Sequence, residues 1–220
     1  MTFLRNTWYC VGWSTEFADK PFVRTILGES LLLFRNKAGS LSAIGDTCPH
    51  RFAPLHKGKF DGDTIQCPYH GLKFDGTGAC VHNPQGTIPR AARVTSYKIE
   101  ERQGIAWIWM GNVEAADTNL IISFPEVVDR DGWTIVRSHI QIDVNYELVT
   151  DNLLDLSHAL YLHLYLTYDH EPVGLQEKRE LKQDGNTVWS MQERARKLLS
   201  QLIRAEDKQN NPTSARRTTA

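Results

Sequence analysis

The sequence predicts a mainly β N-terminal domain, an antiparallel β-sandwich, followed by an α+β domain. Short apolar runs separated by turn residues, an apolar run at residues 105–110 and leucines at helical spacing after residue 145 all favour this class. The 220 residues have 41% hydrophobic and 23% charged content, which is typical of a globular chain. Because the net charge is only −1, there is no electrostatic reason to expect a nucleic acid or an anionic membrane as partner.

In the first half of the chain, β-branched and aromatic residues gather in short runs between turn clusters. The expected strands are Phe22–Leu27, Leu31–Arg35, Leu41–Ile44, Thr64–Cys67, Leu72–Phe74 and Ile105–Met110. Turns are expected at residues 36–39, 61–63 and 75–78, where Asn, Asp and Gly gather. Both alternating faces of Ile105–Met110 are apolar, so we expect this strand to lie between two layers.

The second half of the chain mixes strand and helix patterns. The expected elements are strands at Trp133–Val144, Gln176–Lys182 and Thr187–Met191, and a helix at Tyr146–Leu166. We therefore place a first domain at residues 1–112 and the start of a second domain at residues 113–192. Residues 193–220 form a basic, polar tail with too few apolar side chains to offset its ordering entropy, so we expect it to be disordered.

Two features of the sequence bear on its location in the cell. The chain has no run of about 18 consecutive apolar residues, and its first residues lack the pattern of a signal peptide. We therefore expect no membrane association and a cytoplasmic, reducing location. In such a compartment, cysteines serve more often as metal ligands than as disulfides.

Two Cys/His pairs give the strongest chemical signal, one in Cys48-Pro49-His50 and one in Cys67-Pro68-Tyr69-His70. Each pair offers one thiolate and one imidazole, and a proline next to the cysteine stiffens the backbone. A Rieske [2Fe-2S] cluster needs two Cys on one iron and two His on the other. A zinc site could use the same four residues, but its common spacings pair Cys with Cys and His with His. The spacing favours the iron–sulfur cluster.

A second polar set, Asn152, Asp155, His158 and His163, lies on the expected helix. On a straight α-helix Asp155 and His158 are about 60° apart, and Asn152 and His163 about 20° apart, so these groups gather on one face. The two histidines are about 140° apart, which is too far to share a metal unless a π-turn or a helix end brings them together. A metal site here is a hypothesis, because two histidines on a leucine-rich helix are more often ordinary core or surface residues.

With these motifs the chain resembles the Rieske non-haem iron oxygenases. Cys48-Pro-His50-Arg51 and Cys67-Pro-Tyr-His70-Gly71 resemble the N-terminal domain of this family, and Trp107–Gly111 resembles the strand that closes it. Asp151–His163 resembles the mononuclear iron motif of the family. The similarity is to the branch of the vanillate and dicamba-type O-demethylases and toluenesulfonate methyl-monooxygenase.

The resemblance implies an oxygenase (alpha) subunit that accepts electrons from a flavin/iron–sulfur reductase. With dioxygen, it would hydroxylate or O-demethylate an aromatic, vanillate-like substrate. The implied cofactors are a [2Fe-2S] cluster and a mononuclear Fe(II). The implied ligands are Cys48, His50, Cys67 and His70 for the cluster, and His158 and His163 for the mononuclear iron.

The resemblance also implies roles for two polar residues of the helix. Asp155 would hydrogen-bond a ligand histidine and a Rieske histidine, His70 or His50, of the neighbouring subunit in a head-to-tail homotrimer. Asn152 would lie close to the iron.

The third iron ligand of the family, a carboxylate far downstream of the second histidine, is not recognisable in this sequence. The catalytic domain is therefore expected to be incomplete, and the chain truncated or shortened. One alternative is a Rieske-type electron-transfer protein, or an inactive fragment, that retains only the [2Fe-2S] cluster. Another alternative is a structural zinc-binding module.

Overall fold

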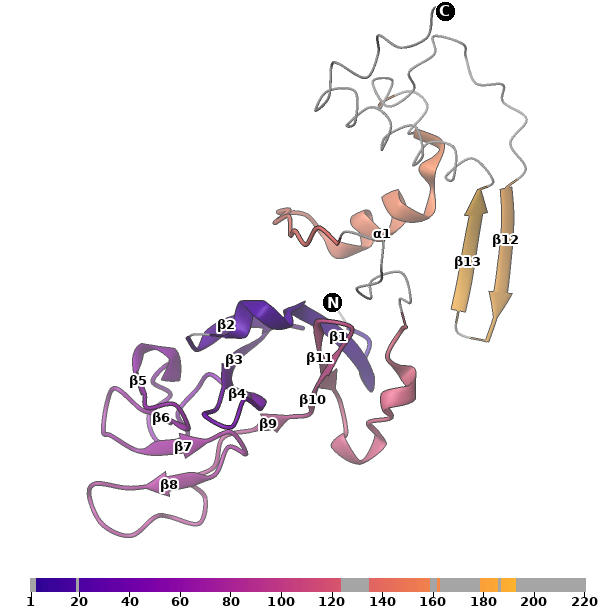
Figure 1. Cartoon of the computed structure of the whole chain (residues 1–220). Coiled ribbons are helices and arrows are strands. Elements are labelled where there is room, and N and C mark those ends of the chain that lie inside the picture. Colours follow the sequence, from indigo (N-terminus) through magenta and orange to yellow (C-terminus); the bar gives the residue numbers. More distant parts are fainter. Residues whose placement is uncertain are drawn as a thin grey trace, which may run out of the picture. The chain divides into compact units, whose positions relative to one another are not determined.

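The structure, a computed structural model, describes residues 3–18, 20–123, 135–158, 162, 179–185 and 187–192. The chain divides into two compact units, Met1–Ser138 and His139–Ala220. Antiparallel strands dominate the first unit, and a helix and a hairpin form the described part of the second (Figure 1). The predicted fold class is confirmed, whereas the predicted domain limits at residues 112 and 192 stay predictions.

Three antiparallel sheets build the first unit. The first sheet has the order β1 (Thr7–Trp13), β11 (Ile105–Met110) and β10 (Ile99–Arg102). The second has the order β2 (Phe22–Ile26), β3 (Glu29–Arg35), β4 (Leu41–Gly45) and β9 (Ser96–Tyr97). The third has the order β5 (Lys59–Phe60), β6 (Thr64–Gln66), β7 (Lys73–Asp75) and β8 (Cys80–His82). Short 3-10 helices lie at Ser14–Phe17 (η1), Leu55–Lys57 (η2), Val113–Ala115 (η3) and Thr118–Leu120 (η4).

Strand β3 is buried on both faces and separates two hydrophobic cores. Leu31 and Leu33 pack with β1 and β11, whereas Leu32 and Phe34 pack with the loops and strands of the third sheet. Successive side chains of a strand point to opposite faces, so an unbroken apolar run supplies both cores. The third sheet and its loops thereby pack against a strand whose central residues, Leu31–Phe34, are buried.

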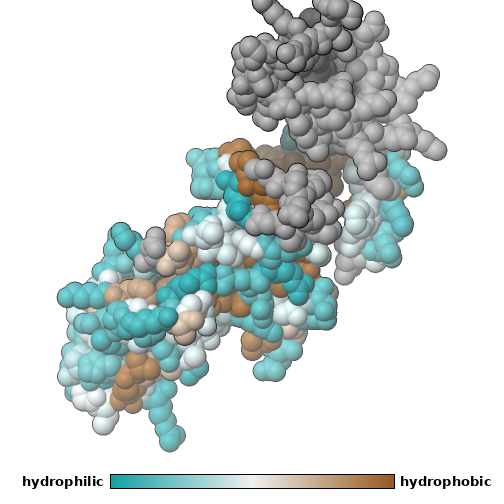
Figure 2. Space-filling model, viewed as in Figure 1, coloured by the Kyte–Doolittle hydropathy of each residue, from teal (hydrophilic) through white to brown (hydrophobic). Residues whose placement is uncertain are grey.

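Strand β11 confirms the expectation of a strand between two layers. Ala106, Ile108 and Met110 contribute to the core shared with β3. Ile105 and Trp107 face the other way, into a smaller core that Trp8 and Ile121 complete. Hydrophilic side chains cover most of the visible face of this unit (Figure 2).

The described part of the second unit contains α1 (Tyr146–Leu154), the 3-10 turn η6 (Leu156–His158) and a hairpin of β12 (Arg179–Asp184) and β13 (Thr187–Gln192). The hairpin agrees with the two strands expected in this part of the sequence. Asn145 begins α1, because its side chain accepts a hydrogen bond from the Glu147 N–H. No helix in these described residues is long and apolar enough to span a bilayer.

Two expectations for the second half of the chain are wrong. Residues 135–144 form no strand: the apolar side chains at residues 136–144 are exposed, no described strand pairs with them, and residues 133–134 lie outside the described residues. Residues 156–158 form a 3-10 turn, Leu162 is again helical, and residues 159–161 and 163–166 lie outside the described residues. The predicted helix Tyr146–Leu166 is therefore interrupted, because α1 ends at Leu154. It ends because the Asp155 carboxylate accepts a hydrogen bond from the Ser157 N–H (3.0 Å), which favours the extended backbone of Asp155 over the helix.

Candidate iron–sulfur centre

The first cysteine loop, residues 47–54, lies between β4 and η2 as a short hairpin. The Cys48 N–H donates to the Ala53 carbonyl (2.9 Å), and the Phe52 N–H donates to the Cys48 carbonyl (3.0 Å). Phe52 closes the tip with φ +55°, in the left-handed region, which costs a non-glycine residue about 1–2 kcal/mol. The backbone thus holds Cys48 in a defined, locally strained turn.

The second cysteine loop, between β6 and β7, repeats this geometry. The Cys67 N–H donates to the Leu72 carbonyl (2.7 Å), and the Gly71 N–H donates to the Cys67 carbonyl (3.2 Å). Gly71 takes the left-handed position with φ +78°, and a Cβ there would lie 3.1 Å from the Pro84 ring. Both cysteines therefore have the same backbone setting, although their histidines follow after two residues in one loop and three in the other.

The structure brings the four predicted cluster residues together as two pairs. Cys48 and Cys67 are 1% and 2% exposed, and their thiols interact directly. The rings of His50 and His70 lie 4.6 Å apart between centroids, nearer the surface. The Tyr69 ring lies 3.9 Å from the His70 ring and covers part of it.

The buried Nδ1 atom of His70 tests whether these residues fit an iron–sulfur cluster. This atom has no hydrogen-bond partner in the structure, and such orphaned polar atoms are costly unless an ion or water satisfies them. In the described part of the chain, no three His, Cys, Asp or Glu side chains converge as a site for one metal ion. A two-iron cluster instead needs a cysteine pair and a histidine pair, one for each iron. The observed arrangement fits the cluster better than a tetrahedral zinc site.

The pKa of the Cys48 thiol is raised overall, and two backbone hydrogen bonds offset this rise only in part. Burial raises the pKa of the Cys48 thiol, and the neighbouring Cys67 thiol raises it further. The backbone N–H groups of His50 and Arg51 hydrogen-bond to the Cys48 sulfur and lower this pKa. These two donors point at the position where the negative charge of a cluster ligand would lie.

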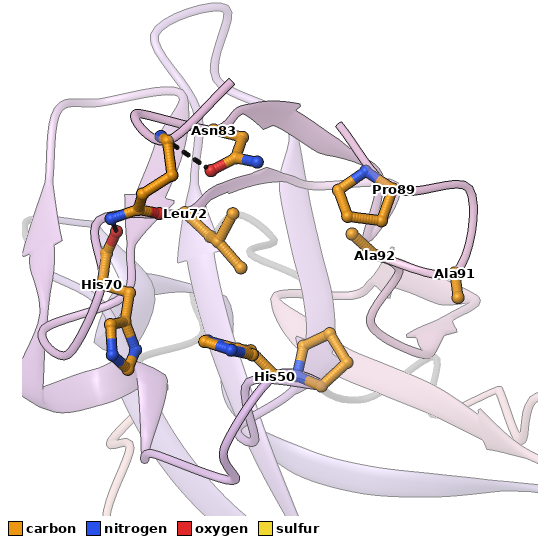
Figure 3. A pocket seen from close by; sticks show the side chains of 9 residues that line it. His50, His70, Leu72, Asn83, Pro89, Ala91 and Ala92 are labelled. Atoms are coloured by element: carbon orange, nitrogen blue, oxygen red, sulfur yellow. Dashed lines mark hydrogen bonds between the residues drawn. The ribbon is translucent and has the colours of Figure 1, made fainter. Parts of the chain in front are cut away.

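A pocket of about 550 Å³ opens beside the histidine pair. Figure 3 shows the two imidazole rings at one end of this pocket, across from Asn83 and Pro89. The Gln85 side chain donates to the His70 carbonyl (3.3 Å), and the Gln85 N–H donates to the Asn83 side chain (3.0 Å). Sequence reasoning missed Asn83 and Gln85, because only the fold brings their loop against the second cysteine loop.

In the second unit, the end of α1 brings Asn152 and His158 together. Asn152 Nδ2 lies 3.5 Å from His158 Nε2, and His158 Nδ1 lies 2.9 Å from the Asp155 carbonyl. Because a carbonyl only accepts, Nδ1 carries the proton and Nε2 carries the lone pair that could bind a metal. The second predicted ligand, His163, lies outside the described residues.

Two successive parts of the chain match models of known protein families. Residues 7–98 match the Rieske [2Fe-2S] domain, and residues 142–220 match the vanillate O-demethylase oxygenase C-terminal domain. The chain thus matches both domains of the Rieske non-haem iron oxygenases in this order, which confirms the resemblance found in its motifs. The second match includes residues 193–220. These residues lie outside the described residues, so their expected disorder stays a prediction.

Two relatives of this chain are oxygenase or iron–sulfur components of bacterial systems. The chain is 46% identical over 165 residues to the oxygenase component of dicamba O-demethylase from Stenotrophomonas maltophilia, covering 74% of this chain and 48% of that protein. It is 42% identical over 163 residues to the iron–sulfur subunit of the toluene-4-sulfonate monooxygenase system from Comamonas testosteroni, covering 73% and 47%. The chain therefore spans about half the length of the curated relatives it matches.

The fold is also similar to a solved structure. The crystal structure of dicamba monooxygenase with non-heme iron and dicamba matches with a TM-score of 0.73 and 39% sequence identity. The match covers 87% of this chain and 54% of that one.

Proposed function

We propose that this chain belongs to the oxygenase component of a multicomponent Rieske non-haem iron oxygenase. It would use dioxygen to hydroxylate or O-demethylate an aromatic, vanillate-like substrate. The observation that carries this proposal is the pairing of Cys48 with Cys67 and of His50 with His70 around an orphaned ring nitrogen. The match of residues 142–220 to an O-demethylase oxygenase domain supports the choice of reaction.

In this proposal the two cysteine loops hold the [2Fe-2S] cluster. Cys48 and Cys67 bind one iron and His50 and His70 bind the other, with His70 Nδ1 as a ligand atom. The cluster would supply one-electron transfer. The protein supplies burial around the thiolates and leaves the histidine side open, which suits electron exchange on that side.

His158 and His163 would hold the mononuclear Fe(II), where the activation of dioxygen takes place. The Asp155 carbonyl holds His158 in the tautomer that a metal ligand needs. Asn152 lies beside His158 and would position it or a bound molecule. Asp155 would carry electrons between centres by linking a ligand histidine to His50 or His70 of a neighbouring subunit.

The partners follow from this chemistry. O-demethylation consumes dioxygen and two electrons and releases a phenol and formaldehyde, so a separate reductase must supply the electrons. We propose a flavin/iron–sulfur reductase for this role and a homotrimer as the assembly. A cytoplasmic location, and the absence of nucleic-acid and membrane partners, stay predictions. The electron-transfer alternative is less well supported, because it leaves the match of residues 142–220 unexplained.

Metal analysis of the anaerobically purified full chain tests the proposal, combined with formaldehyde release from an aryl methyl ether in the presence of a reductase. We expect about three iron to two sulfide per chain. His158→Ala should lose formaldehyde release and one iron but keep the visible spectrum, whereas Cys67→Ser should lose the spectrum. His82→Ala, which alters an exposed histidine of β8, is the control. A colourless, zinc-containing chain would contradict the proposal.

A further inference from the structure

Asp46 is the one charged or polar residue that is buried in the described part of the chain, with 4% exposure. It stands directly before the first cysteine loop, two residues from Cys48. Burying a carboxylate is strongly unfavourable unless hydrogen bonds and an opposite charge satisfy it. An apolar residue would fill the same space without this cost, so the contacts of Asp46 call for a specific role.

Both ends of the first cysteine loop meet at Asp46. One carboxylate oxygen, Oδ1, accepts a hydrogen bond from the His56 N–H (2.8 Å), and the other, Oδ2, pairs with His56 Nδ1. The Asp46 carbonyl accepts a third hydrogen bond, from the Leu55 N–H (2.9 Å). We call the pair of Asp46 and His56 the loop clasp, because it joins the residue before the loop to the residues after it.

The loop clasp is also tied to the buried strand β3. The Asp46 N–H donates to the Ser30 carbonyl (3.0 Å), and the Ser30 hydroxyl donates to Asp46 Oδ2 (3.4 Å). Ser30 is exposed, but it directly precedes the buried run Leu31–Phe34, so the base of the loop is joined to the strand that supplies both cores. The His56 side chain is partly exposed, so it closes the base from the solvent side.

We propose that Asp46 and His56 are positioning residues for the iron–sulfur cluster. The loop clasp fixes the separation of the loop ends and thereby places Cys48 and His50 opposite Cys67 and His70. This inference rests on the proposed function, because it concerns the proposed cluster. Residues that orient ligands in this way commonly change metal affinity by about 10–100-fold when they are mutated.

Two substitutions of His56 separate positioning from simple stabilisation. Asn places its side-chain N–H near the position of His Nδ1, so His56→Asn keeps the bond to Asp46. His56→Leu removes that bond but keeps a side chain of similar bulk. Glu101→Gln is the matched control, because it breaks the partly buried pair of Glu101 and Arg35 elsewhere in the same unit.

The readouts are the electron paramagnetic resonance (EPR) spectrum of the reduced full chain, the midpoint potential and the half-life of the cluster in the presence of a chelator. We expect His56→Leu to alter the spectrum and the potential and to lose its cluster about tenfold faster. His56→Asn should restore the wild-type values. Glu101→Gln should lower Tm and leave all three readouts unchanged.

The inference is overturned if His56→Leu keeps the wild-type spectrum, potential and cluster half-life, whatever its Tm, or if His56→Asn behaves as His56→Leu does. If His56→Leu does not fold, His56→Gln replaces it, because Gln presents its N–H near the Nε2 position instead. Equal behaviour of the Gln and Asn variants would then overturn the inference. A wild-type chain without a cluster overturns the proposed function itself. This result is distinct from a cluster whose properties do not change when His56 is substituted.

Discussion

Leu32 and Leu33 are neighbours on β3, are both fully buried, and belong to different cores. Leu32 packs in the core that contains Cys48 and Cys67, whereas Leu33 packs against β11. Replacing each leucine by alanine removes the same atoms from the same strand. The two variants therefore differ mainly in which core receives the cavity.

Each substitution should lower the free energy of unfolding by about 2–5 kcal/mol, the usual cost of a buried Leu→Ala cavity. Complete burial of both side chains favours the upper part of this range. Only Leu32→Ala opens space beneath the cysteine loops, so it should also release the cluster several-fold faster than Leu33→Ala. Urea unfolding measures the first effect, and decay of the visible absorbance with a chelator measures the second.

The two-core description is refuted by either of two results. One is equal rates of cluster release in Leu32→Ala and Leu33→Ala when their unfolding free energies fall by similar amounts. The other is a loss below about 1 kcal/mol for both variants, because a cavity at a fully buried site costs more than this.

Three further predictions concern single positions. Phe52→Gly relieves the positive φ and loses little buried surface, because Phe52 is 78% exposed. Urea unfolding should therefore show an unchanged free energy of unfolding or a gain of up to about 1 kcal/mol. A clear loss would contradict the claim that Phe52 is strained. Gly58→Ala makes a Cβ clash with the Gln66 carbonyl oxygen, so thermal unfolding should show a loss of about 2 kcal/mol or more, and an unchanged Tm would contradict this packing. Hydrogen bonds from Arg35 lower the pKa of the Glu101 carboxyl in the folded protein. The pair's contribution to the free energy of unfolding is therefore present above the unfolded pKa of about 4.3, and it is lost as the pH falls through the lower folded pKa. Since the pair is partly exposed, Glu101→Gln should cost at most about 1 kcal/mol at pH 7 and less near pH 4; a pH-independent difference in urea unfolding would contradict the linkage.

The sequence predicted well the elements that depend on local pattern. Ile105–Met110 could be placed between two layers because both of its faces are apolar, and the six residues form β11 as expected. The two Cys/His pairs could be expected together because their chemistry needs a common site, and the structure places them in matching loops.

Other features depend on contacts that the pattern does not contain. The leucine spacing continues past residue 154, but a hydrogen bond from the Ser157 N–H to the Asp155 side chain ends the helix there. This helix end also brings Asn152 to His158, which a straight helix would not do. Asp46 gave no signal in the sequence, because its role arises only when the loop closes on His56.

The midpoint potential of the purified full chain tests the central claim most directly, because it reports the mixed cysteine and histidine ligation. A cluster held by Cys48, Cys67, His50 and His70 should have a potential between about −150 and +300 mV. A potential near −400 mV, which is typical of plant-type clusters with four cysteine ligands, would contradict the assignment of His50 and His70 as ligands.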